Sequence, residues 1–322
     1  MDNLDEENTE LLIDVARRFY LQDQSKVDIG KEMGISRFRV ARLLAEARDK
    51  KIVTITIAEG QRPHFELEQK LAERLKLKSV FIAASDADPR RERERLAKEA
   101  AKYLNTIVKP GQTIGLSWGR TLLPMAAYLE NLPPVTIVQT TGIVGNDPSQ
   151  SPIEIISRIR MKSDVQAKAL IAPLFASSAS SAKALRSEPN VENVLHLYKR
   201  LDIAISSIGS WASKVTQLGD SFEKKAKEEL DKKGAVADFS GIFFDKNGQY
   251  VDSIVNERRI SISSNELAKT PVVMAVAGGT AKTSAIHAVC QTGLATCLFT
   301  TRDVAEELLG LPAVTNPTWT RV

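Results

Sequence analysis

Cysteine and histidine are scarce in this chain of 322 residues. The two cysteines, Cys290 and Cys297, form neither a CxxC pair nor a zinc-ligand spacing, so we expect two reduced core thiols in a cytoplasmic protein. The three histidines, His64, His196 and His287, are scattered singly along the chain. This scatter argues against a histidine-rich metal site, and we expect neither a metal nor another cofactor.

Targeting signals and long apolar runs are also missing. The first ten residues, MDNLDEENTE, are acidic and contain neither the positive nor the apolar region of a signal peptide. No uncharged apolar run approaches the roughly twenty residues that span a membrane. We therefore expect no membrane partner. With 43% hydrophobic and 26% charged residues the chain can form a sizeable core, and its length suggests two domains.

The positive charge is concentrated near the N-terminus. The whole chain has a net charge of +4, and residues 36–51 alone contain six Lys or Arg against two Asp or Glu. A basic helix in a chain whose other residues have no net charge suggests a nucleic-acid contact, although such a charge run is also typical of a solvated helix face.

The pattern of residues 11–51 predicts two helices, a glycine turn and a third helix. Apolar residues recur at helical spacing up to about Leu21, and Ser25 is a candidate N-cap for a short second helix over 26–33. Gly34 stands where a tight turn needs a left-handed residue, and Ser36 is a candidate cap for the third helix. The apolar stripe of this third helix is Val40, Leu43, Leu44 and Ala47.

This order of elements is typical of a helix-turn-helix that lays its third helix in the DNA major groove. Arginine suits that helix because its planar fork binds guanine or phosphate in a bidentate manner. The alternative is a three-helix interaction module with a basic face. The predicted DNA contacts, all at the start of the third helix, are Ser36, Arg37, Phe38, Arg39 and Arg42.

A domain boundary is expected directly after this segment. Residues 51–58, KIVTITIA, alternate like a short strand that either forms a wing or leads into the next domain, and residues 59–64 resemble a linker. We assign residues 1–58 to the DNA-binding domain and residues 59–322 to a second domain.

In the second domain, strand and helix patterns alternate, which predicts an α/β fold with a doubly wound, mostly parallel sheet. Strands are expected at 79–84, 113–118, 135–142, 169–175, 202–209, 235–244, 251–256, 272–279 and 295–301, with a hairpin turn at Asn247-Gly248. Helices are expected at 90–104, at 122–130 and after Thr280, and the serine-rich residues 175–183 are expected to form a loop.

The stretch AVAGGTAKTSAI, residues 275–286, is similar to a nucleotide-binding loop but lacks its spacing. Ala277 and Ala281 stand where a P-loop requires glycine, so a nucleotide triphosphatase is not expected. Gly278, Gly279 and Lys282 still leave backbone N–H groups and a cation at the start of a helix. This arrangement is either a generic anion site or a plain strand-to-helix turn.

Ligands of doubly wound sheets bind beyond the carboxyl ends of the strands, so the loops there are expected to converge. Two further loops combine glycine with hydroxyl or cationic donors, as a phosphate or a polyhydroxylated ligand requires. Their residues are Gly115, Ser117, Trp118, Gly119, Arg120 and Thr121 in the first loop, and Thr140, Thr141 and Gly142 in the second.

Along nearly its whole length the chain resembles the SorC-type sugar-responsive transcriptional regulators. The resemblance lies in DIGKEMGISRFRVARLLAEARDKKIV, LEQKLAERLKLKSV, GQTIGLSWGRTL, LFASSASSAKALRSEPNVENVL, DIAISSIGS, GIFFDKNG and VVMAVAGGTAKTSAI. It implies an effector domain similar in fold to sugar-phosphate isomerases and deaminases. It also implies homotetramers, as dimers of dimers, that bind operator DNA and respond to a sugar, a polyol or a sugar phosphate.

The resemblance places effector contacts on the loops named above and adds Asp238. Phe38, Arg39 and Ala41 depart from the family's usual Pro, Thr and Ser, so the operator sequence does not follow from it. The competing interpretation is a sugar-phosphate isomerase or deaminase with Asp238 as general base. The histidines form no motif for such proton transfer, and we expect a regulator with no catalytic residue.

Overall fold

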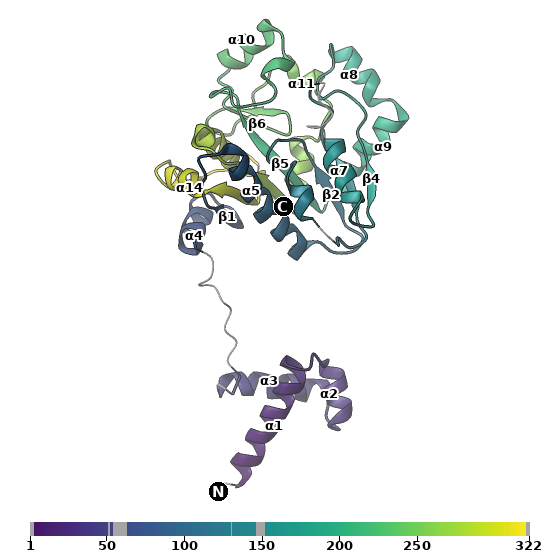
Figure 1. Ribbon diagram of the computed structural model, residues 1–322, viewed down its shortest axis with the longest axis vertical. Helices are drawn as coiled ribbons and strands as arrows, with labels where there is room; N and C mark the ends of the chain where they lie inside the picture. The colour runs from purple at the N-terminus through teal and green to yellow at the C-terminus, as the bar shows by residue number, and fades with distance from the viewer. Residues whose placement is uncertain (1–2, 51, 54–62, 130, 146–151, 320–322) are drawn as a thin grey trace. The chain divides into compact units, whose positions relative to one another are not determined.

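The computed structural model describes residues 3–50, 52–53, 63–129, 131–145 and 152–319 (Figure 1). The chain divides into two compact units, Met1–Pro63 and His64–Val322. The predicted boundary between residues 58 and 59 lies outside the described residues, as does most of the predicted strand at 51–58.

The first unit consists of α1 (Asn3–Tyr20), α2 (Lys26–Glu32) and α3 (Arg37–Asp49). The two serine caps form as predicted, since Ser25 Oγ accepts from the backbone N–H of Asp28 and Ser36 Oγ from that of Arg39, each at 3.2 Å. Gly34 has a φ of +67°, the left-handed conformation that the turn requires. The predicted stripe of α3 is buried together with residues of α1 and α2, and this small core consists of Leu12, Val15, Ala16, Ile29, Val40, Leu43, Leu44 and Ala47.

The second unit is built on a mostly parallel sheet in the order β1-β9-β8-β5-β2-β3-β4, with β6 antiparallel to β5 and β7 antiparallel to β6. Its strands are β1 (Ser79–Ala83), β2 (Thr113–Leu116), β3 (Thr136–Gln139), β4 (Gln166–Lys168), β5 (Ile203–Ser210), β6 (Ala237–Phe239), β7 (Ile242–Phe244), β8 (Val272–Val276) and β9 (Cys297–Thr301). Its helices are α4 (Phe65–Arg74), α5 (Pro89–Ile107), α6 (Met125–Tyr128), α7 (Pro152–Arg160), α8 (Ala179–Arg186), α9 (Pro189–Leu197), α10 (Lys224–Lys232), α11 (Val255–Arg258), α12 (Ser264–Lys269), α13 (Thr283–Thr292) and α14 (Arg302–Leu309).

Helices cover both faces of this sheet. Ile203 and Ile205 of β5 belong to the core that includes α5, α6 and α7, whereas Ala204 and Ile208 belong to the core that includes α4, α9, α13 and α14. Successive strand residues therefore serve opposite faces, as a doubly wound sheet requires. The α/β prediction is confirmed, and both cysteines are buried and unpaired.

Four expected elements differ from the structure. Residues 169–175 form isolated bridges rather than a strand, and Pro173 within them has no N–H for a ladder. Residues 235–244 are two strands, because Ser240 and Gly241 turn the chain with φ of +55° and +77°. Residues 251–256 do not form a strand, and the last two of them begin α11. Of the expected serine-rich loop at 175–183, residues 179–183 belong to α8, which Ser178 caps.

Candidate functional site

A cavity of about 340 Å³ lies at the carboxyl ends of the parallel strands. It is bordered by segments that follow or end β1, β2, β5, β6, β8 and β9, which the topology brings to one edge of the sheet. Its lining is Asp86, Pro89, Glu92, Arg93, Trp118, Gly119, Arg120, Thr121, Ser207, Ile208, Gly209, Val215, Thr216, Gln217, Asp238, Gly278, Gly279, Thr280, Lys282 and Asp303. This is the position at which doubly wound sheets bind ligands.

The structure brings most of the predicted effector residues to this cavity. Those in the lining are Trp118, Gly119, Arg120, Thr121, Asp238, Gly278, Gly279 and Lys282. Those outside the lining are Gly115, Ser117, Thr140, Thr141 and Gly142. The loop after β2 contributes only its later residues, the loop after β8 contributes all of its predicted residues, and the loop after β3 contributes none, so the predicted convergence is partial.

The segment after β3 is separated from the cavity by a distant part of the chain. Ile262 donates its backbone N–H to Thr140 O at 2.8 Å, and Gly142 donates to Ile260 O at 3.0 Å. Thr141 is fully buried, and its Oγ1 has no hydrogen-bond partner among the described residues. Residues 260–262 therefore occupy the edge at which the sequence pattern had placed a ligand.

The cavity wall contains two oppositely charged groups, the buried Asp238 and the half-buried Lys282. Lys282 Nζ donates to Ile208 O at 2.8 Å, and burial lowers its pKa to about 8 although the charge of Asp238 opposes this. Burial raises the pKa of Asp238 to about 6, against the opposing effects of a hydrogen bond from Thr216 and the charge of Lys282. Asp238 Oδ2 is buried beside Gly209 and has no hydrogen-bond partner among the described residues, so this carboxylate oxygen lacks a donor.

Two arginines add positive charge to the same cavity. Arg93 of α5 and Arg120 of the loop after β2 both line it, and neither has a hydrogen bond or an ion pair within the described part of the chain. Burial first, and then the charge of Arg120, lower the pKa of Arg93. The charges of Asp88 and Glu92 act on Arg93 in the opposite direction. Two guanidinium groups without a hydrogen-bonded or ion-paired partner suit an anionic ligand.

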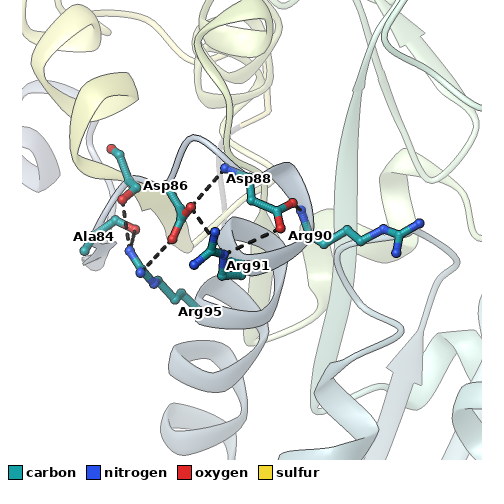
Figure 2. A network of polar contacts seen from close by, with 7 residues as sticks. Ala84, Asp86, Asp88, Arg90, Arg91 and Arg95 are labelled. Atoms are coloured by element: carbon teal, nitrogen blue, oxygen red, sulfur yellow. Dashed lines mark hydrogen bonds and ion pairs between the residues drawn. The ribbon is translucent and has the colours of Figure 1, made fainter.

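Four acidic residues, Asp86, Glu92, Asp238 and Asp303, lie in the same lining. Asp86 is paired with Arg95, whose Nη2 lies 2.7 Å from Asp86 Oδ2 (Figure 2). Burial, and then the charge of Asp303, raise the pKa of Glu92. Cationic and acidic side chains therefore both line the cavity near Arg93.

The network in Figure 2 orders the loop between β1 and α5. Asp86 Oδ1 accepts from the backbone N–H of Asp88 at 2.9 Å, and Asp88 in turn caps α5 by accepting from Arg90 N at 2.8 Å. Arg95 Nη1 also donates to Ser85 O at 2.9 Å. These contacts determine where α5 begins and thereby place Arg93 at the cavity.

Two glycines of the cavity wall are required by close packing. A Cβ on Gly278 would lie 2.6 Å from Leu96 Cδ1, and a Cβ on Gly209 would lie 1.9 Å from Asp238 Oδ2. Gly279 has a φ of +86°, which L-residues with side chains rarely adopt. The glycines thus allow the backbone to approach the site.

The sequence analysis missed several lining residues. They could have been found by the rule that selected the other loops, namely that ligands bind beyond the carboxyl ends of the strands. Asp86, Glu92 and Arg93 follow the strand at 79–84, and Asp303 follows the strand at 295–301. Ser207 lies near the carboxyl end of the strand predicted at 202–209. The segments that carry Asp86, Glu92, Arg93 and Asp303 lack glycine, and Glu92 and Arg93 fall in the helix predicted at 90–104.

The predicted DNA contacts lie together on the outer face of α3. Ser36, Arg37, Phe38, Arg39 and Arg42 are all exposed, opposite the buried stripe of that helix. The Arg37 guanidinium lies 4.8 Å from the centroid of the Phe38 ring.

Within the described residues, no group of three or more His, Cys, Asp or Glu side chains is placed to hold a metal ion. In the same part of the chain, every helix is too short or too polar to cross a membrane.

Comparisons with known proteins cover almost the whole chain. Residues 61–310 match a family model described as "Putative sugar-binding domain". The deoxyribonucleoside regulator of Bacillus subtilis (strain 168) is 26% identical over 310 residues, 95% of this chain and 99% of the relative. The sorbitol operon regulator of Klebsiella pneumoniae is 26% identical over 321 residues, 96% of this chain and 100% of the relative. The crystal structure of the full-length sorbitol operon regulator SorC from Klebsiella pneumoniae has a TM-score of 0.73 at 24% identity, covering 96% of this chain and 99% of that chain.

Proposed function

Because the chain belongs to the sugar-binding domain family of SorC-type regulators, we propose that it is a DNA-binding transcriptional regulator of carbohydrate or polyol metabolism genes. Its operator affinity changes when a sugar, a polyol or a sugar phosphate enters the cavity of the second unit. The relatives named above are transcriptional regulators, which supports a non-enzymatic role.

The observation that carries the effector proposal is the charge arrangement of the cavity. Arg93 and Arg120 have no partner among the described residues, Lys282 lies beside them, and Asp238 offers an unpartnered carboxylate oxygen. A phosphate or another anionic group suits the cations, and ligand hydroxyls suit the carboxylate. A phosphorylated, polyhydroxylated molecule satisfies both.

The first unit is proposed to be the helix-turn-helix domain, with residues 1–58 as the DNA-binding domain and residues 59–322 as the effector domain. Its α3 would lie in the major groove, where exposed Arg39 and Arg42 contact bases or phosphates. The short turn through Gly34 and the cap by Ser36 support this geometry, because they direct the basic first turns of α3 outward.

The regulator is proposed to act in the cytoplasm as a homotetramer made of two dimers. An effector alters operator affinity only if it binds one quaternary arrangement more tightly than another, by a coupling free energy of about 1 to 3 kcal/mol.

Fluorescence anisotropy of the intact protein on DNA from upstream of its own operon tests this proposal. We expect tight, salt-sensitive binding that a pool of sugar phosphates and free polyols alters. Arg42→Ala should weaken binding by about 1 to 3 kcal/mol. Arg48→Ala, an exposed change in the last turn of the same helix, is the matched control. Absence of DNA binding with and without the pool would contradict the proposal.

A further inference from the structure

Phe38 is an aromatic residue on the surface of the first unit. It is the second residue of α3 and is 69% exposed. The apolar stripe of α3 points to the core on the opposite side, and the neighbours of Phe38 on the outer face are Arg37, Arg39 and Arg42. An exposed phenyl ring among cations on the first turn of a helix is suited to a partner that is both anionic and locally apolar.

The ring is partly ordered by its neighbour. The Arg37 guanidinium lies 4.8 Å from the ring centroid, within the range of a cation–π contact. The ring remains exposed beside this contact.

We propose that Phe38 recognises the 5-methyl group of a thymine in the major groove. This inference rests on the proposed DNA-binding function. N-terminal residues of a recognition helix contact base edges, and a phenyl ring has no hydrogen-bond donor or acceptor for them. The thymine methyl is the apolar group that base edges present in the major groove, and phenylalanine is one of the side chains that contacts it. Phe38 thus specifies a thymine, while the flanking arginines bind phosphate or guanine.

The test uses duplexes that the full-length chain selects from a random-sequence library. Each thymidine of a selected duplex is replaced singly by deoxyuridine, which lacks only the methyl group. We expect about fourfold weaker binding at one thymine of each half-site, since burial of one carbon corresponds to about 0.8 kcal/mol. Phe38→Ala should bind the thymine and uracil duplexes equally and should keep the salt dependence that the arginines confer.

Leu21→Ala is the matched control, because Leu21 is an apolar residue of the same unit and is 79% exposed. This variant should discriminate thymine from uracil as the wild type does. Two results overturn the methyl contact and leave the regulator proposal intact. In the first, the wild type binds every uracil-substituted duplex as tightly as the thymine duplex. In the second, Phe38→Ala still binds the thymine duplex more tightly than the uracil duplex. Failure of the chain to select any duplex refutes DNA binding itself, and the inference with it.

Discussion

Replacing Asp238 with Asn should stabilise the protein while it removes an effector contact. Burial raises the pKa of this carboxyl from 3.8 to about 6, so the unfolded chain loses its proton first as the pH rises. As the pH rises from 3.8 past 6, the free energy of unfolding therefore falls by about 3 kcal/mol, at roughly 1.4 kcal/mol for each unit of difference between the two pKa values. Asn at this position does not ionise. Lys282 loses a favourable negative charge in the variant, so we expect a net gain of about 2 kcal/mol at pH 7.

Urea denaturation of the wild type and Asp238→Asn between pH 4.5 and 7.5 measures this effect. The difference between the two free energies of unfolding should shrink as the pH falls toward 4.5, should vanish only below 3.8, where the carboxyl is protonated in both the folded and the unfolded state, and should be largest above pH 6. Asp220→Asn, at an exposed carboxyl, is the control and should show no such divergence. A variant that is less stable than the wild type at pH 7, or a difference that does not change with pH, would refute the reasoning.

Two further predictions concern the cavity. Arg93→Ala should weaken the binding of a sugar phosphate at least tenfold, as measured by calorimetry, because a hydrogen bond to a charged group contributes about 1.5 to 3 kcal/mol. The affinity for a free polyol should change much less. Lys98→Ala, an exposed cation on the same helix, is the control, and equal losses for both ligands would show that no anion binds at Arg93. Gly209→Ala should abolish effector binding, because the new Cβ would lie 1.9 Å from Asp238 Oδ2. Gly219→Ala is its control, since no heavy atom lies within 4 Å of the position of its Cβ, and wild-type affinity in Gly209→Ala would contradict the proposed site.

The elements that the sequence predicted well are specified by local signals. The caps at Ser25 and Ser36 and the left-handed Gly34 act within a few residues, so the pattern alone indicates where α2 and α3 begin. The parallel strands appear as buried apolar runs, and their carboxyl ends are the place where Gly279 and Lys282 were expected and lie.

The features that the sequence did not predict depend on contacts between distant segments. Nothing near Thr140 in the chain shows that residues 260–262 pair with it and cover that edge of the sheet. Arg93 belongs to a highly charged helix whose pattern is that of a solvated face. Its place in the cavity lining, near Arg120, appears only in the folded structure.

The central claim is that the effector cavity and the operator contact are coupled in one protein, and reciprocity of binding tests it most directly. The operator Kd of the intact protein is measured with and without saturating effector, and the effector Kd with and without saturating operator. The account predicts that both Kd values change by the same factor, about 5 to 150. If both ligands bind and neither Kd changes, the two sites are independent, and that result would contradict a sensing role for the cavity.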